Sequence, residues 1–440
     1  MPSAVAASAV SRLPGPQWAV PVLPIVAVVA LLAVPTPSAG GMTLADAACG
    51  LVVVCAAVQT VRRLRRPLTR TAVAVLALPV LGIAVAAAGA ATPGDAVMGL
   101  VRYLQVFVLV PVAVVLLLRD RRDARLVLWS VVGLALYQGA VGMHQFVTAT
   151  GASYQGATIR AVGTFGASDV MGMATVVSYG VVCAVGLALG AGASAQRTAA
   201  ALCALALLAP LAVSFSRGAW IATAVACGAQ MALAGGRRGL KVVATVVATG
   251  VVLVGGFGVG AAVVQERLDS ITRVTDTPDQ SVVDRYTLWA AAVDMWREHP
   301  VTGVGLKAFP AYRDSHASVA LSSASDTMDA GHSFKRQALL SPHNMYLLIL
   351  SEQGLIGLIG LAGSWLALLV LGLRRLRRAG RTRDCALAVC GLLLWQLVDF
   401  GYADIGGPST ALIPVGLGVA AWWALARGAT SVPATREAVR

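Results

Sequence analysis

Charged residues are scarce in this chain of 440 residues: they make up 12% of it, against about 25% in soluble globular domains. Aromatic residues are few as well, at 6%, whereas 58% of the residues are hydrophobic. This composition excludes an ordinary soluble enzyme, a disordered chain and a nucleic-acid-binding module. We therefore attribute the net charge of +14 to the basic loops of an inner-membrane protein, and not to a polyanionic partner.

The sequence also lacks the patterns of metal and disulfide chemistry. Its seven cysteines all lie in apolar runs, so they offer neither a disulfide framework nor zinc-ligand spacing. No acid pair and no cluster of histidine, cysteine and carboxylate falls in a connection on the side opposite the basic loops. We predict no metal site and no cofactor.

What the chain has in abundance is long apolar runs, and about twelve of them are long enough to cross a bilayer as helices. The stretches are 17–36, 42–60, 71–91, 97–118, 126–147, 165–190, 198–215, 218–234, 242–264, 343–373, 385–403 and 410–427. The predicted fold class is therefore all-α, a polytopic membrane protein with one large extracytoplasmic loop. The predicted regions are 1–264 (helices one to nine), 265–342 (the loop), 343–427 (helices ten to twelve) and 428–440 (a cytoplasmic tail).

Arginine-rich connections alternate with connections that carry no Lys or Arg, and this pattern predicts the orientation. Twelve threaded helices put every basic connection on one side, which the positive-inside rule makes cytoplasmic, together with both termini. The basic connections are 62–70, 119–125, 197, 237–241 and 374–383. The long loop then lies outside, and we predict a multi-pass protein of the cytoplasmic (inner) membrane with its active site on the extracytoplasmic side.

Part of the long loop has a helical pattern. Tyr286, Trp289 and Trp296 recur at helical spacings, Ser281-Val-Val-Asp284 has the form of a capping box, and Pro300 is a stop signal. We predict an amphipathic helix over 282–298, lying at the outer membrane surface with its tryptophans at the boundary between lipid and water.

Three arginines stand out because positive charge on the outer side opposes the orientation rule. Arg217 interrupts two apolar runs, and it is either an interfacial anchor or a ligand-binding group. Arg102 lies inside a span, where a structural pair with Asp95 or Asp399 competes with contact to substrate. For Arg160 the structural alternative is an ion pair with Asp169, which lies just inside the predicted span 165–190.

Two further groups are candidates for chemistry. Arg285 opens the predicted loop helix, against the preference of the helix dipole, although Asp284 beside it could compensate. In Ser341-Pro-His-Asn we expect Ser341 to cap a membrane helix and His343 to lie in its first turn. A helix N-terminus and nearby arginines disfavour the imidazolium, so His343 is expected to be a neutral proton acceptor, or else a structural hydrogen-bond donor.

Five short motifs in this order resemble the superfamily of O-antigen ligases and O-antigen polymerases, over roughly 155–373. The motifs are Gly163-Thr-Phe-Gly166, Phe215-Ser-Arg-Gly-Ala-Trp220, Arg285-Tyr-Thr-Leu-Trp289, His299-Pro-Val-Thr-Gly-Val-Gly305 and His343-Asn-Met-Tyr-Leu347 with Glu352 and Gly354. The family often has an asparagine after the first motif, where this chain has Ala167-Ser168-Asp169.

The resemblance implies a metal-independent glycosyltransferase that moves a glycan from a polyprenyl-pyrophosphate carrier to an acceptor hydroxyl at the outer membrane face. It assigns the pyrophosphate to Arg217 and Arg285 and activation of the acceptor to His343. We add Arg160, Arg102, Asn344 and Glu352 as expected substrate-binding residues. The implied partners are the lipid-linked glycan donor, a glycan, lipid or cell-wall acceptor and membrane lipids, with no nucleic acid.

Other functions are compatible with parts of the pattern. A solute transporter would share the twelve spans, but paired repeats are not visible and the long loop divides the spans nine to three. A cell-wall peptidoglycan polymerase would use a carboxylate base, for which Asp284 or Asp294 are the candidates, but the His-Asn motif argues against it. A non-catalytic envelope scaffold would leave the outward arginines unexplained. The sequence does not separate ligase from polymerase.

Overall fold

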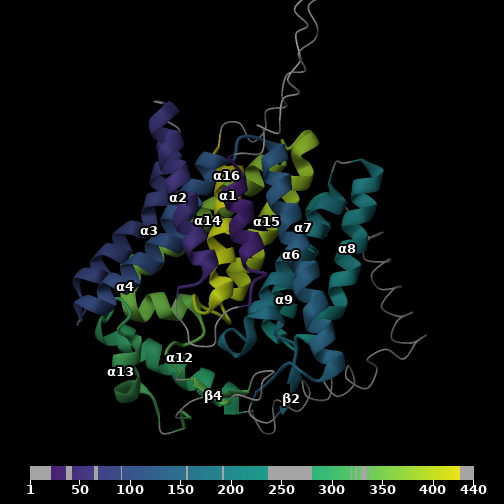
Figure 1. The fold of residues 1–440 in the computed structure, drawn as a ribbon. Helices are drawn as coiled ribbons and strands as arrows, with labels where there is room; N and C mark the ends of the chain where they lie inside the picture. The colour runs from purple at the N-terminus through teal and green to yellow at the C-terminus, as the bar shows by residue number, and fades with distance from the viewer. Residues whose placement is uncertain are drawn as a thin grey trace, which may run out of the picture.

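The computed structural model describes residues 21–35, 42–63, 68–90, 92–154, 157–190, 193–235, 280–318, 320–322, 325–328, 334–337 and 339–426. Within these residues the chain is a bundle of long helices whose axes run side by side (Figure 1). At one end of the bundle, α12 (Gln280–Glu298), α13 (Phe309–His316) and a small sheet form a separate layer.

The bundle follows the apolar runs of the sequence. Its helices are α1 (Leu23–Leu31), α2 (Leu44–Arg63), α3 (Arg70–Ala88), α4 (Pro93–Leu104), α5 (Val110–Leu117), α6 (Arg121–Thr148), α7 (Gly172–Leu189), α8 (Ser194–Val213), α9 (Arg217–Ala234), α14 (Met345–Leu376), α15 (Arg383–Asp399) and α16 (Leu412–Leu425). A π-helical turn, Gln105–Leu109, joins α4 to α5 in one continuous apolar run. The helical architecture predicted from these apolar runs is confirmed.

Eight helices among the described residues are long and apolar enough to cross a membrane. They are Leu44–Arg62, Arg70–Ala88, Ala96–Leu117, Arg121–Thr148, Gly172–Leu189, Ser194–Val213, Met345–Leu376 and Pro408–Leu425. The predicted total of about twelve spans remains a prediction. The predicted span 242–264 lies outside the described residues.

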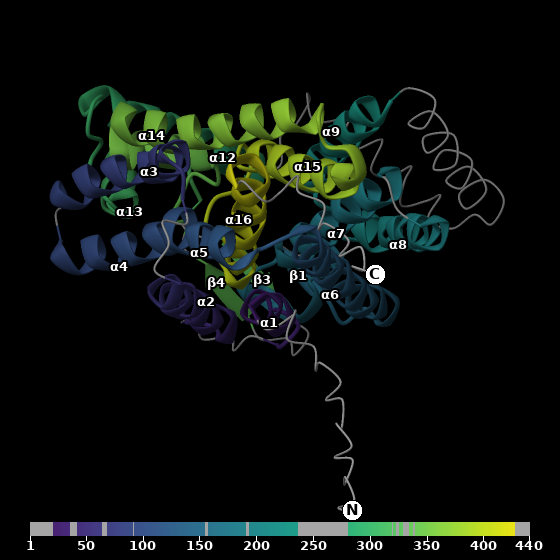
Figure 2. The same ribbon diagram turned by 90° about the horizontal axis from the view of Figure 1, so that it is seen from above.

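The most buried element is α16, which stands in the middle of the bundle (Figure 2). All of its residues are buried, and α5, α14 and α15 pack around it. Burial on every side matches a sequence that is apolar all round, with no polar face for solvent. Its last carbonyls are satisfied by Arg375 of α14, whose Nη1 donates to the carbonyl oxygens of Trp423 and Ala426 at 2.8 and 2.7 Å.

Small residues allow α3 and α14 to approach closely. The backbone of Gly82 lies directly against that of Gly357, and Gly360 faces the carbonyl of Leu78. Ser364 Oγ donates to the carbonyl oxygen of Val75 at 2.8 Å across the same interface. Helices in lipid associate through such close backbone contact, because lipid offers no hydrophobic driving force between them.

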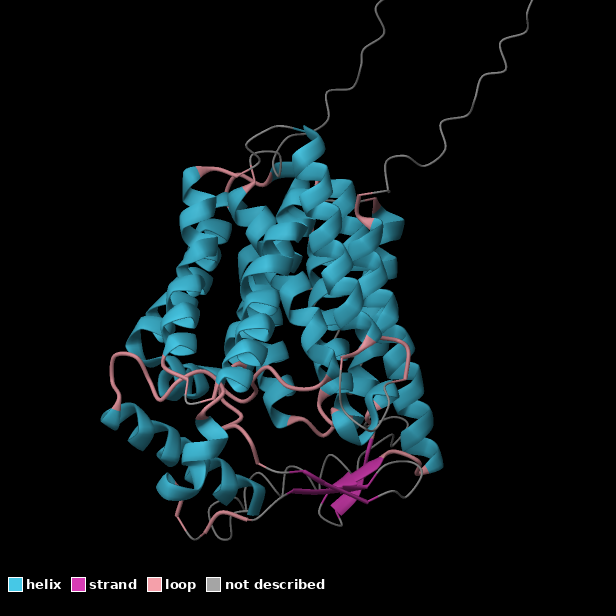
Figure 3. Ribbon diagram, turned by 60° about the vertical axis from the view of Figure 1, so that its left-hand side comes forward, coloured by secondary structure: helices cyan, strands magenta, loops and turns pink. Residues whose placement is uncertain are grey.

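The sheet in the end layer was not predicted from the sequence. Its strands are β1 (Ala152–Tyr154), β2 (Ala157–Arg160), β3 (Ser325–Met328) and β4 (Phe334–Gln337), all antiparallel in the order β2-β1-β3-β4. Figure 3 shows the sheet in magenta beyond the ends of the long helices. Two strands come from the connection between α6 and α7 and two from the long segment before α14. The sheet therefore joins two connections that are far apart in the sequence.

At the opposite end of the bundle Asp384, at the start of α15, binds two arginines from the start of α6. Arg121 Nη2 lies 2.7 Å and Arg125 Nε 3.4 Å from Asp384 Oδ2, and this carboxylate is 1% exposed. Arg125 Nη2 also donates to Gln196 Oε1, and Arg383 Nη2 donates to the carbonyl of Leu233 at the end of α9. These contacts place four connections at one end, which we call the basic end.

Candidate functional site

The segment 400–404, which follows α15, binds the start of α14. The backbone N–H of Met345 donates to the carbonyl oxygens of Phe400 and Ala403 at 2.8 and 3.0 Å. Asn344 Nδ2 donates to the carbonyl oxygen of Gly401 at 3.1 Å. The 400–404 segment thereby fixes His343, the residue immediately before Asn344.

Arg285 reaches the same segment from α12. Its Nη1 donates to the carbonyl oxygen of Tyr402 over 3.5 Å, a long hydrogen bond. One turn further along α12, Trp289 Nε1 donates to the carbonyl oxygen of Pro342 at 2.8 Å. The helix predicted over 282–298 is thus confirmed as α12. Its side chains bind the backbone of Pro342, directly before His343, and of Tyr402 in the 400–404 segment.

Arg217 is the first residue of α9, the third helix that contacts the 400–404 segment. Its neighbour Gly218 presses against the side chain of Tyr402, so closely that an added Cβ would lie 3.3 Å from the Tyr402 Cβ. Ser216 caps the helix by accepting from the backbone N–H of Ala219 at 3.3 Å. Arg217 thus lies at the N-terminus of α9, and a helix N-terminus and a guanidinium both favour phosphate oxygens.

Arg160 binds the backbone just before α9. Its Nη2 donates to the carbonyl oxygen of Phe215 at 3.3 Å, and Nη1 lies 3.5 Å from Met171 Sδ. Asp169, the expected partner of Arg160, instead accepts a 2.8 Å hydrogen bond from the backbone N–H of Ser409. Burial raises the pKa of Asp169 to about 6.

His343 does not lie in the first turn of α14, so that prediction was wrong. The helix begins at Met345 and its cap is Asn344, whose Oδ1 accepts from the backbone N–H of Leu347 at 3.1 Å. Asparagine is among the strongest N-caps, and here it replaces the expected Ser341. His343 therefore precedes the helix, with a left-handed backbone at φ 49°.

Left-handed backbone is uncommon outside glycine and often marks functional positions. Among the described residues it occurs at four non-glycine positions, two of which belong to this site. These are His343 and Phe215, the latter two residues before Arg217.

The surroundings of His343 favour the neutral form of its imidazole by lowering its pKa. Burial lowers its pKa from the ordinary 6.5, and the Arg285 guanidinium acts in the same direction, while the Asp404 carboxylate opposes both. Arg285 and Asp404 therefore both lie close enough to His343 to change its pKa. A half-buried imidazole with a lowered pKa is suited to accept a proton near pH 7.

Asp404 is the residue that sequence reasoning missed. It follows the 400–403 turns, and its Oδ2 is buried without a hydrogen-bond partner. The available signal was its place in a connection that lacks Lys and Arg, directly after an apolar run. An unsatisfied buried carboxylate oxygen calls for a partner, and a ligand hydroxyl would serve.

Glu352 has a structural setting inside α14. Its Oε1 accepts from the backbone N–H of Phe309 at 3.3 Å, and its Oε2 accepts from Tyr103 Oη at 3.4 Å. The side chain is 1% exposed. Glu352 therefore holds the start of α13 against the bundle.

The same part of α14 explains two of the glycine motifs. At Gly354 the helix is interrupted, with φ 62° and ψ −160°, and the chain from Pro300 to Gly305 occupies the interruption. The N–H of Leu355 donates to the carbonyl of Pro300 at 3.0 Å, and the N–H of Val304 donates to the carbonyl of Ser351 at 2.8 Å. The His299–Gly305 motif and the Glu352–Gly354 motif therefore pack against each other and form one contact.

Two other polar side chains make unexpected contacts. Arg102 Nη1 forms an ion pair with Asp46 Oδ1 of α2, a partner that the sequence analysis did not name. Asp284 does not cap α12, because the helix begins at Gln280, and its carboxylate accepts from the N–H and Oγ of Ser322.

Within the described residues, no three His, Cys, Asp or Glu side chains gather as a metal site would require. The described part of the chain is thus a helical membrane-type bundle in which the helices that carry Arg217 and Arg285 and the residue before Asn344, His343, meet the 400–404 segment.

Comparison with known families agrees with this description. Residues 200–362 match the family model described as O-antigen ligase, a region that runs from α8 to α14 and includes Arg217, Arg285 and His343. The match supports membership of the O-antigen ligase superfamily, as the motifs indicated. No curated protein matches the chain.

Proposed function

We propose that this protein is a membrane glycosyltransferase of the ligase or polymerase type. It would move a glycan from a polyprenyl-pyrophosphate carrier to an acceptor hydroxyl on the outer face of the cytoplasmic membrane. The observation that carries the proposal is the 400–404 segment, because it contacts the start of α14 beside His343, Arg285 on α12 and Gly218 beside Arg217.

In the proposed step the neutral His343 imidazole accepts the proton of the acceptor hydroxyl. The acceptor oxygen forms a bond to the anomeric carbon of the donor sugar. The bond from that carbon to the bridging phosphate oxygen breaks, and its electron pair leaves with the polyprenyl pyrophosphate. Arg217 and Arg285 stabilise the charge that develops on the departing pyrophosphate, as guanidinium groups match phosphate oxygens.

These roles require no metal ion, since the two arginines supply the positive charge that a divalent cation would otherwise bring to a pyrophosphate. The proposal therefore treats the reaction as metal-independent. Asp404 is assigned to the acceptor, because its unpaired oxygen could take a hydroxyl hydrogen bond beside His343.

The expected substrate-binding residues divide into two groups. Arg160 remains a proposed contact to the lipid-linked glycan donor, because it binds the backbone of Phe215, two residues before Arg217. Asn344 and Glu352 act by positioning, since their side chains already bind the backbone of Leu347, Gly401 and Phe309. Arg102 is engaged by Asp46, which supports a structural role for it.

Alanine substitution of Arg217, Arg285 and His343, one at a time, tests the assignment. Each variant is incorporated into membranes and supplied with a lipid-linked glycan and acceptor, and glycan transfer is measured. We expect a loss of about 10²–10⁴-fold for His343→Ala, the contribution typical of a general base. Arg297→Ala, in the same helix as Arg285 but 69% exposed, is the matched control and should transfer normally.

Full transfer by the His343→Ala and Arg217→Ala proteins would reject the mechanism. Gradient-dependent uptake of a solute into proteoliposomes, unaffected by these substitutions, would favour a transporter instead.

A further inference from the structure

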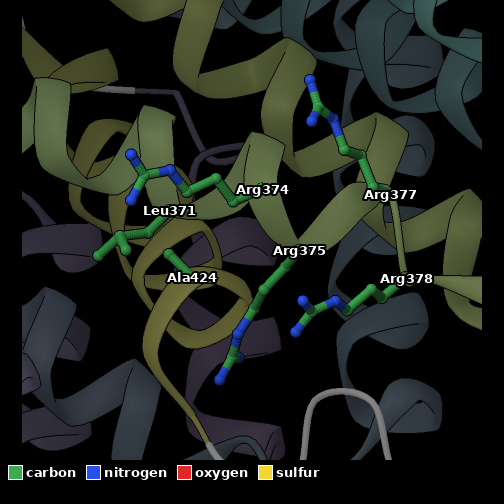
Figure 4. A pocket seen from close by; sticks show the side chains of 6 residues that line it. All are labelled: Leu371, Arg374, Arg375, Arg377, Arg378 and Ala424. Atoms are coloured by element: carbon green, nitrogen blue, oxygen red, sulfur yellow. The ribbon is translucent and has the colours of Figure 1, made fainter.

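A cluster of arginines at the basic end of the bundle is not used by the proposed reaction. Arg374, Arg375, Arg377 and Arg378 form the end of α14 and the residues just after it. Together with Leu371 and Ala424 they line a cavity of about 340 Å³ between α14 and α16 (Figure 4). No acid is among the residues that line it.

The arginines of this cavity have different roles. Arg375 is partly buried and occupied by the carbonyls of Trp423 and Ala426, so it fixes one wall. Arg374 and Arg378 are exposed, and Figure 4 shows Arg374 extending beside Leu371 and Arg378 extending toward Arg375. In the part of the chain that the structure describes, neither Arg374 nor Arg378 forms an ion pair. Figure 4 shows Arg377 extending away from the other three arginines, so an anion in the cavity would have to balance the like charges of Arg374, Arg375 and Arg378.

We propose that this cavity binds a phosphate-bearing anion, namely the head group of an anionic membrane lipid. The phosphate would accept from Arg374 and Arg378, and the acyl chain would leave along Leu371. A lipid fits better than free phosphate because the cavity lies at the ends of two candidate membrane spans, Met345–Leu376 and Pro408–Leu425, and so at the level of lipid head groups. The proposal does not depend on the transferase function.

The alternative explanation is that these arginines only orient the protein and complement the C-terminal dipole of α14. Orientation needs charge but no cavity, whereas lipid binding needs both. The two explanations therefore differ in what happens when the cavity is filled while the charge is kept.

The test measures thermal unfolding of the full-length protein in detergent micelles with increasing phosphatidylglycerol, phosphatidylcholine or inorganic phosphate. We expect phosphatidylglycerol to raise the melting temperature and phosphatidylcholine to leave it unchanged. In the double variant Arg374→Gln/Arg378→Gln the apparent affinity for phosphatidylglycerol should fall about tenfold or more. Arg122→Gln removes an exposed arginine at the same basic end and is the matched control.

Leu371→Trp keeps every charge but fills the cavity, and it should weaken phosphatidylglycerol binding as well. Wild-type affinity in both the double variant and Leu371→Trp would overturn the site. Equal protection by inorganic phosphate at the same concentration would overturn the lipid as its occupant. Arg375 is left unchanged in all variants, because it supports the end of α16.

Discussion

At the scale of single residues, the site depends on where His343 stands relative to its neighbours. The residue types were readable from the sequence: an imidazole beside an asparagine, and arginines on the wrong side of the orientation rule. The helix boundary was not readable, because Ser341 and Asn344 are both good caps and only the fold selects one. Asp404 was missed for a related reason, since its closeness to His343 arises from a contact between distant segments.

The pKa of His343 predicts the pH dependence of transfer. A base acts only when neutral, so activity should fall as the pH drops through the pKa of His343, which lies below its ordinary 6.5. Because the Asp404 carboxylate raises this pKa, Asp404→Asn should move the acidic limb to lower pH. The measurement is the pH profile of kcat/KM for both proteins. An acidic limb that stays in place or moves upward would argue against the pairing.

At the scale of elements, the long helices followed directly from the apolar runs, and α12 followed from its helical spacing. The sheet could not be predicted in the same way, because its strands have three or four residues each and pair across distant connections. The glycines of the His299–Gly305 and Glu352–Gly354 motifs were recognised from the sequence, but their structural role was not. They let the Pro300–Gly305 chain enter the interruption of α14.

Gly354 and Gly363 form a matched pair within α14. Gly354 has φ 62° and faces the carbonyl of Val301, so Gly354→Ala should destabilise the protein by about 1–3 kcal/mol. Gly363 has open space around it, so Gly363→Ala should be neutral or stabilise by up to about 1 kcal/mol. Thermal unfolding of the purified proteins compares the two. Equal effects of both substitutions would contradict the role assigned to Gly354.

At the scale of the whole molecule, charge separates the two ends of the bundle. Asp384 and the arginines that bind it lie at the basic end, and α14 runs from Met345, two residues after His343, to Leu376 at that end. α9 runs likewise from Arg217 toward Leu233, which contacts Arg383. This polarity is the structural counterpart of the alternating basic connections, and it underlies our proposal that the site faces outward.

Cysteine labelling in intact cells tests that orientation. Ser318→Cys introduces an exposed thiol in the end layer, and Arg122→Cys introduces one at the basic end. A thiol reagent that does not cross the membrane should label the first variant before lysis and the second only after lysis. The unsubstituted protein, with its own cysteines, sets the background. The reverse pattern would place the His343 end in the cytoplasm.

The four-stranded sheet has a consequence for biogenesis. β1 and β2 leave the ribosome before α7, α8 and α9, whereas β3 and β4 follow them. If the end layer faces outward, as we propose, the first hairpin reaches the far side of the membrane before its partner strands, with one edge unpaired. That edge is closed only when the later hairpin is translocated, so the end layer becomes complete as α14 begins to insert. A nascent chain halted after α9 would expose a strand edge that a chaperone or a second nascent chain could bind.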